Sequence, residues 1–219
     1  LDTADVAALT TAQVSNLSTS NVAALTSAQV KVLGSDQLQS LSSAQINALD
    51  AADVTAMGTD QIAALSTGQI SKLSNANIEA LGTAQVAALT SSQVSALTTS
   101  QLALVSDAQF TAMGSSQLAG LTSGQFAALS ESQVQAMSTA EVAALSTAQV
   151  ASMGSGAVSL MSSGQIKALS SAQVSSLTTT QLNALSEEQI QALDTADVAA
   201  LTTSQLAGLS NAKMTDLSS

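Results

Sequence analysis

The chain has 219 residues, a net charge of −11 and no His, Cys, Trp, Tyr or Pro, and its four basic residues are all Lys. Because most catalysis relies on His, on an activated Cys or on clustered carboxylates with a cation, and His and Cys are missing, we expect no enzyme. The negative charge excludes nucleic acid and anionic lipid as partners, and two Phe cannot build a stacking platform for single strands. The uncharged stretches, such as residues 142–166, carry Ser, Thr or Gln every few residues, so we expect no membrane insertion.

An eight-residue unit repeats from the first residue to Leu217 without insertion or deletion, with the consensus Leu-Ser-Thr-Ala-Gln-Val-Ala-Ala. The sixth position is Val, Ile, Leu, Phe or Met in all 27 complete octads. The first position is Leu except at Met57, Val105, Met113, Met137, Met153 and Met161. We therefore predict a single repeat array over residues 1–219, made of 27 octads and the start of a twenty-eighth, with no separate globular domain.

Three backbone conformations compete for this unit. In a continuous α-helix, eight residues turn through about 800°, so the Leu column would spiral around the helix and present no fixed face. In a strand, the first and sixth positions would point to opposite faces, because they are separated by an odd number of residues. A β-solenoid with corners remains the alternative, although the Ala and Gln content disfavours strands.

The polar columns favour one short helix in each octad. The second position is Asp, Ser, Thr or Gly throughout, and these residues are preferred at the N-cap. The fifth position is Gln in 19 octads, and Ser or Thr followed three residues later by Gln forms a capping box. We predict helices of about seven residues, each from a second octad position to the next Leu: 2–9, 10–17, 18–25 and so on to 210–217.

The number of helices in each coil of the solenoid is predicted from two features. These are the short connections between helices and a set of residues that recur at multiples of 24 positions, here called the 24-residue echo. A connection this short favours a corner over a hairpin, which gives three helices per coil, or four. The echo is seen in Gly34, Gly58 and Gly82, and in the pairs Asp2/Asp5, Asp50/Asp53 and Asp194/Asp197. The predicted fold is therefore an all-α solenoid. With three helices per coil and about 8–10 Å between stacked helices, the array should be a rod roughly 70–90 Å long.

The octad also predicts which side chains are buried. The two apolar columns, at the first and sixth positions, should face one continuous interior. The third position should face water, because Thr, Ser, Asn, Glu and Ala interchange there, as at Thr3, Ser27, Ala51, Asn75 and Glu131.

Four groups of residues are candidate sites, and each has a structural explanation. The three Asp-x-x-Asp pairs resemble calcium ligands, but acids also favour the first turn of a helix. The five Met of the first column replace Leu, so they should fill the core rather than bind a metal or haem. Ser71 with Lys72 lacks an oxyanion hole, and Glu187 with Glu188 should be solvated first-turn acids. We predict no catalytic, cofactor-binding or metal site.

Regular Thr and Ser arrays can bind ice, and a repetitive face can also bind a glycan. The free mixing of residues at the third position (Thr11, Thr19, Ser27, Ala51, Asn75 and Glu131 among them) argues against such a face. A repetitive-surface binding module for ice or glycan is the alternative function.

The motif Leu-Thr-Thr-Ala-Gln-Val-x-x-Leu at Leu9–Leu17, with near-copies at Leu89–Leu97 and Leu201–Leu209, resembles octapeptide arrays in very large secreted or surface proteins of bacteria. Those proteins are labelled adhesins or, loosely, haem utilisation or adhesion proteins. The resemblance implies an extracellular or cell-surface location and a role as stalk, matrix fibre or filament. The haem part finds no support here, because His, Tyr and Cys are absent.

The partners follow from the same features. Neither end of the sequence carries a polar capping repeat, so we expect the solenoid to continue or its ends to stack on other copies. The predicted partners are other copies of the chain, in end-to-end or lateral assembly, or other surface components.

Overall fold

The computed structural model describes residues 1–217, and each octad in this range contains one helix of four to six residues. The described residues contain no strand. The all-α prediction is therefore confirmed and the β-solenoid alternative is wrong. Ser218 and Ser219, which belong to the predicted start of a twenty-eighth octad, lie outside the described residues.

The helices fall into two compact units. Unit 1, residues Leu1–Met113, contains α1 (Thr3–Ala8), α2 (Thr11–Ser15), α3 (Thr19–Ala23), α4 (Ser27–Lys31), α5 (Ser35–Ser40), α6 (Ser43–Ile46), α7 (Ala51–Ala56), α8 (Thr59–Ala64), α9 (Thr67–Ile70), α10 (Asn75–Ala80), α11 (Thr83–Ala88), α12 (Ser91–Ala96), α13 (Thr99–Leu102) and α14 (Asp107–Thr111). Unit 2 begins at Gly114 and contains α15 (Ser115–Ala119), α16 (Ser123–Ala127), α17 (Glu131–Ala136), α18 (Thr139–Ala143), α19 (Thr147–Ser152), α20 (Ser155–Ser159), α21 (Ser163–Lys167), α22 (Ser171–Val174), α23 (Thr179–Ala184), α24 (Glu187–Gln191), α25 (Thr195–Ala200), α26 (Thr203–Gly208) and α27 (Asn211–Asp216).

Helix α23 shows how an octad starts and stops its helix. Thr178 is the N-cap, and its Oγ1 accepts a hydrogen bond of 3.2 Å from the backbone N–H of Gln181. In return, Gln181 Oε1 accepts from the backbone N–H of Thr178 at 2.7 Å, which completes the capping box. Leu185 ends the helix with extended backbone (φ −61°, ψ 145°). The predicted seven-residue length was too long, because the second octad position is the N-cap and the C-cap is the next first-position residue, as in α23, or a residue before it, such as Asn16 and Asn47.

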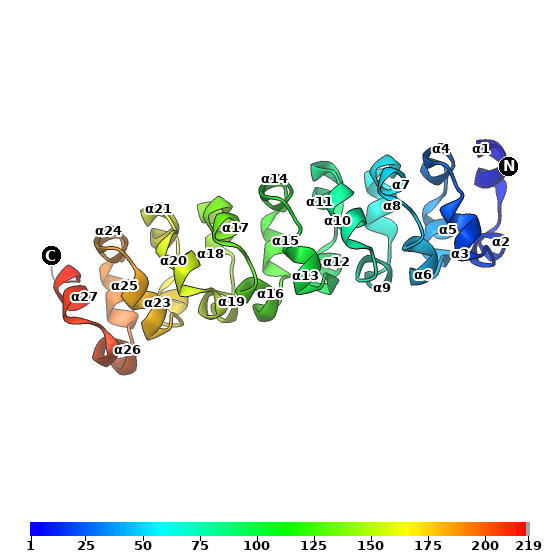
Figure 1. Cartoon of the computed structure of the whole chain (residues 1–219). Coiled ribbons are helices and arrows are strands. Elements are labelled where there is room, and N and C mark those ends of the chain that lie inside the picture. The colour runs from blue at the N-terminus through cyan, green and yellow to red at the C-terminus, as the bar shows by residue number, and fades with distance from the viewer. Residues whose placement is uncertain (218–219) are drawn as a thin grey trace. The chain divides into compact units, whose positions relative to one another are not determined.

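The extended backbone at the ends of the octads turns the chain, so that every third helix stacks. In unit 1, α4 packs against α1 and α7, while α5 packs against α2 and α8. In unit 2, α20 packs in the same way against α17 and α23. Figure 1 shows this succession of coils within each unit. Three helices per coil are thus confirmed, and the glycines of the 24-residue echo, Gly34, Gly58 and Gly82, are the N-caps of α5, α8 and α11.

Each unit has its core inside the coils, where most residues of the two apolar columns lie. In α7, for example, Val54 is 1% exposed, and Met57 after it is 4% exposed. Both Phe side chains, Phe110 and Phe126, are also buried at the sixth octad position. The predicted burial fails at Leu1, Leu206 and Met214, which are exposed. The third octad position is exposed or half-buried in every described octad, as predicted.

Candidate functional site

The fifth octad position links one coil to the next, and Gln93 on α12 is a clear example. Its side chain is 2% exposed. Gln93 Oε1 accepts from the N–H of Thr90 at 2.7 Å, which caps its own helix. Gln93 Nε2 donates to the carbonyls of Ile62 at 2.9 Å and Leu65 at 2.7 Å, at the C-terminal end of α8. One amide therefore satisfies orphan groups at the start of one helix and at the end of the helix four octads earlier.

This arrangement recurs through both units, and we call it the glutamine ladder. In each case Nε2 donates to the carbonyl 28 residues earlier, at N···O distances between 2.5 and 2.9 Å. Its members include Gln29, Gln37, Gln45, Gln61, Gln69, Gln85, Gln93, Gln101, Gln109, Gln149, Gln165, Gln173, Gln181, Gln189 and Gln205. The ladder joins coils by hydrogen bonds that are buried or part-buried between them, apart from the exposed bond of Gln29.

Sequence reasoning found the capping role of these glutamines and missed their role between coils. A Glu at the fifth position would cap its helix equally well, because capping uses only an acceptor oxygen. Gln occupies 19 octads there and Glu occupies one. This preference was the available signal, since only the carboxamide can also donate.

The three Asp-x-x-Asp pairs are capping boxes, and in two of them, Asp50/Asp53 and Asp194/Asp197, the link to the neighbouring coil runs in the opposite direction. Asp50 Oδ1 accepts from the N–H of Asp53 at 2.8 Å, and Asp53 Oδ2 accepts from the N–H of Asp50 at 3.3 Å. A carboxylate cannot donate to carbonyls, and Asp53 instead accepts from Ser27 Oγ at 3.0 Å on α4. Asp197 accepts from Ser171 Oγ in the same way, at 2.9 Å. Within residues 1–217, no three side chains among His, Cys, Asp and Glu are grouped so that they could hold a metal ion.

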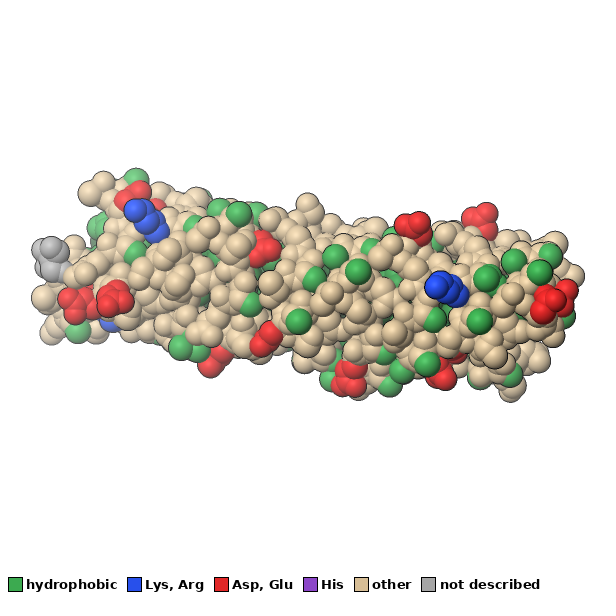
Figure 2. All heavy atoms as spheres, turned by 90° about the horizontal axis from the view of Figure 1, so that it is seen from above, with side chains coloured by type: hydrophobic (Ala, Val, Ile, Leu, Met, Phe, Trp, Pro, Cys, Tyr) green, Lys and Arg blue, Asp and Glu red, His purple; other side chains and the backbone are tan. Residues whose placement is uncertain are grey.

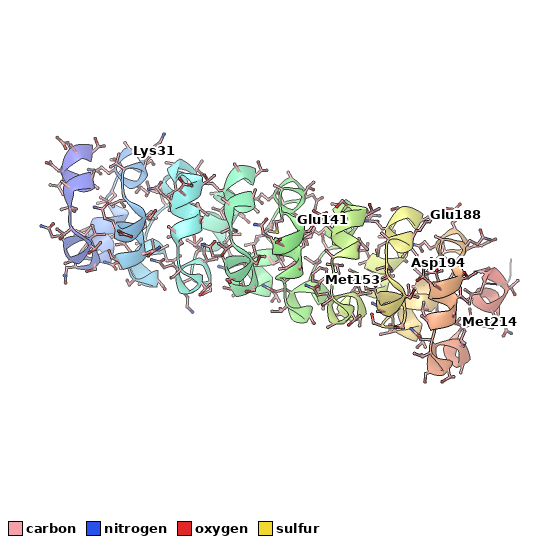
Figure 3. All side chains as sticks on the ribbon, turned by 180° about the vertical axis from the view of Figure 1, so that it is seen from behind. Lys31, Glu141, Met153, Glu188, Asp194 and Met214 are labelled. Atoms are coloured by element: carbon pink, nitrogen blue, oxygen red, sulfur yellow. The ribbon has the colours of Figure 1, made fainter. Side chains whose placement is uncertain are left out.

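The five Met of the first column lie in the core, as predicted. Met57, Met113, Met137, Met153 and Met161 are each at most 5% exposed. Figure 3 labels Met153 together with Met214, a residue of the sixth column on α27 that is 46% exposed. The buried methionines fill space that Leu fills in other octads.

The remaining candidate groups serve the local structure. Ser71 Oγ donates to the carbonyl of Gly68 on its own helix at 3.1 Å, while the Lys72 side chain is exposed. Glu187 and Glu188 are exposed in the first turn of α24, and Glu187 accepts from Gln191 Nε2 at 3.2 Å. Figure 3 shows Glu188 near the start of this helix. The exposure of Glu187 and Glu188 agrees with the prediction that they are solvated first-turn acids.

The sequence pattern described as the ALTTAQ repeat matches residues 1–35, 30–67, 63–99 and 158–195, which together cover more than half of the chain. The chain belongs to the ALTTAQ repeat family. The pattern's six letters occur here from Ala8 to Gln13, so they include the N-cap Thr10 and end at a fifth octad position. A comparison with curated proteins gave no match.

The outer surface of this ALTTAQ protein carries widely spaced charges. Figure 2 shows, on the face in view, scattered acidic side chains and fewer Lys, with hydrophobic side chains between them. Lys213 and Asp216 form an ion pair at 3.4 Å. No helix in the part of the chain that the structure describes is both long enough and apolar enough to pass through a membrane.

Proposed function

We propose that this ALTTAQ array is a non-enzymatic structural region of an extracellular or cell-surface bacterial protein, such as an adhesin, matrix fibre or filament. In that protein it would act as a stalk or as the unit of a polymer. The observation that carries the proposal is the glutamine ladder. The most uniform polar position of the octad is used to hold one coil on the next, and not to present a surface.

The distribution of uniform and variable positions supports a structural role. The first, fifth and sixth positions, which are nearly uniform, lie inside or between the coils. The third position, which faces outward, holds Thr, Ser, Ala, Asn, Asp or Glu. A repeat that had to recognise a ligand would need its exposed side chains to be the uniform ones.

The charge and composition support an exposed fibre. A net charge of −11 opposes unspecific sideways aggregation, and the absence of Arg with only four Lys leaves few sites for trypsin-like proteases. The proposed partners are other copies of the chain, in end-to-end or lateral contact, or other components of the cell surface.

The proposal can be tested by changing the number of coils in the protein as the producing cells make it. Deleting residues 58–81 removes 24 residues, which is one whole coil of α8, α9 and α10. A stalk or fibre unit should stay on the cell surface, accessible to added protease, and adhesion or cohesion should decline in steps as coils are removed. A matched control replaces the exposed Thr59, Thr67 and Asn75 with Ala at full length, and it should leave adhesion unchanged. Retention of the array inside the cells, or loss of adhesion in the control alone, would contradict the proposal.

A second candidate function is binding to ice or to a glycan. One side of unit 1 provides the observation that favours it. Helices α3, α6, α9 and α12 stack on one another and contain no Asp or Glu. Their third positions are Thr19, Ser43, Thr67 and Ser91. At the fourth position, however, Ala44 and Gly68 interrupt the hydroxyls, and Ser43 Oγ already donates to the carbonyl of Gly68 at 3.1 Å.

This second candidate is tested by measuring ice-recrystallisation inhibition and retention on immobilised polysaccharides. The double variant Thr19→Asp/Thr67→Asp should abolish either activity if this side is a binding face. The control Thr59→Asp/Thr83→Asp makes the same change on α8 and α11. No activity in the unmodified chain, or equal loss in both variants, would exclude the hydroxyl side as a site.

A further inference from the structure

The octad that contains α20 departs from all the others in unit 2. Its N-cap is Gly154, which has no side chain, and its fifth position is Ala157 in place of Gln. Helices α10 and α27 also lack a capping box, but the side chains of Ser74 and Ser210 still cap them. Among the described helices, α20 alone has neither a side-chain cap nor a capping box.

The missing carboxamide leaves polar groups without partners on both sides of the coil boundary. In the preceding octad, Gln149 accepts from the N–H of Ser146 at 2.8 Å and donates to the carbonyl of Leu121 at 2.7 Å. The equivalent groups at α20 are the N–H of Gly154 and the carbonyl of Leu129, and neither makes a hydrogen bond within the described residues. Leu129 belongs to the end of α16, so the ladder is broken between α16 and α20.

The backbone at Gly154 differs from that of the neighbouring N-caps, and no atom lies where a ladder glutamine would place its oxygen. The ψ angle of Gly154 is 142°, whereas the N-caps of the flanking helices, Ser146 and Ser162, both have a ψ of 156°. A Cβ placed on Gly154 would meet no atom within 4 Å. By contrast, a Cβ on Gly114, the glycine N-cap of α15, would lie 3.9 Å from Gln117 Oε1.

The other end of α20 is held normally. Gln189 Nε2 donates to the carbonyl of Val158 at 3.2 Å and to that of Met161 at 2.5 Å. Helix α20 also packs against α17 and α23. The coil before α20 also bonds to this end, because Gln135 Nε2 on α17 donates to the carbonyl of Leu160 at 3.2 Å. The N-terminal end of α20 is therefore the end that lacks a hydrogen bond to the coil before it.

We propose that the boundary between the C-terminal end of α16 and the N-terminal end of α20 is the interior opening point of unit 2. At this boundary the N-terminal turn of α20 separates from the preceding coil, while its C-terminal end stays attached through Gln189. Local openings occur where few buried contacts and hydrogen bonds oppose them. Under load, the stack opens here before it opens at any interior boundary that a ladder glutamine closes.

Native-state hydrogen exchange on the 219-residue chain tests this proposal. In the unmodified protein, the backbone amides of residues 154–158 should exchange about tenfold or more faster than those of residues 146–150 and 162–166. The double variant Gly154→Ser/Ala157→Gln restores the consensus and should bring residues 154–158 to the rate of their neighbours. The control Ala148→Gln adds the same side chain at an exposed position and should change nothing.

The converse variant distinguishes a broken ladder from a generally mobile helix. Gln149→Ala removes the ladder residue of α19 and should make residues 146–150 exchange as fast as residues 154–158 of the unmodified protein. Equal exchange of residues 146–150, 154–158 and 162–166 in the unmodified protein would overturn the proposal. Unchanged exchange in both the double variant and Gln149→Ala would overturn it as well.

Discussion

At the residue scale, the ladder glutamine combines two tasks that proteins more often give to separate side chains. Its oxygen caps the start of one helix, and its nitrogen caps the end of another. The last carbonyls of a helix have no partner within that helix. A solenoid of helices this short therefore contains many carbonyls that need a partner outside their own helix. No buried side-chain N or O atom among the described residues lacks a hydrogen-bond partner.

Substitution of Gln93 should separate the two tasks. We expect Gln93→Ala to lower the free energy of unfolding by about 1–3 kcal/mol, because it leaves the N–H of Thr90 and a buried carbonyl unpaired. Gln93→Glu keeps the acceptor but places a buried carboxylate against two carbonyls, so it should cost more, about 3–5 kcal/mol at pH 7. Denaturant unfolding monitored by circular dichroism measures both values.

The loss of stability caused by Gln93→Glu should become smaller as the pH falls, because the protonated acid can donate a hydrogen bond to a carbonyl. The folded variant then binds the proton more tightly than the unfolded chain, so its stability relative to the parent rises toward low pH. Gln39→Glu, the same change at an exposed position of α5, is the control and should stay within about 0.5 kcal/mol of the parent. Equal losses in Gln93→Glu and Gln39→Glu would contradict the assigned donor role.

At the scale of the element, a helix of four to six residues is too short to be stable alone, because nucleation costs more than so few hydrogen bonds return. Each helix therefore depends on its caps, on its two buried side chains and on the coils beside it. Stability is expected to be the sum of such octad and neighbour contributions.

The apolar columns can be tested on a single helix, α11. Val86→Asp should destabilise the protein by about 3–5 kcal/mol, because Val86 is 1% exposed and the new carboxylate has no partner. Thr83→Asp puts the same charge on an exposed residue in the first turn, where the helix dipole favours it, so the change should be near zero. Thermal unfolding of the two variants compares them directly, and similar shifts would disprove the burial pattern.

Replacement of Gly by Ser should have opposite effects on stability at two positions, Gly58 and Gly208. Gly58→Ser adds a capping hydroxyl to α8 with the new Cβ at 3.8 Å from Gln61 Oε1, which is ordinary contact. It should stabilise by about 0.5–1 kcal/mol. Gly208→Ser places a Cβ 2.7 Å from Thr179 Cγ2, so it should destabilise by about 1–3 kcal/mol. Chemical denaturation distinguishes them, and a stabilised Gly208→Ser variant would show that α23 and α26 are packed less closely.

At the scale of the whole molecule, each unit is a stack in which helices three octads apart pack together. The rod of about 70–90 Å, drawn from nine coils at helix-packing distance, stays a prediction for the chain of 219 residues. Small-angle scattering should give a radius of gyration well above the roughly 17 Å of an ordinary domain of this length. A value near 17 Å would disprove the rod and weaken the proposed role as a stalk.

The sequence alone determined the features that arise within eight residues. Position 178 predicts a cap, position 181 completes its box, and the sixth position of that octad predicts the buried Leu182, since all of these interactions are local. Only the tertiary structure decided which carbonyls accept a hydrogen bond from Gln181 Nε2. It also decided that Asp53 pairs with Ser27 and that Ala157 breaks the ladder. Those partners lie 26 to 31 residues apart, and nearly identical octads offer the same groups at every multiple of eight. The turn of the extended backbone at the end of each octad selects among them, because it closes a coil after three helices and brings the fourth octad back into reach.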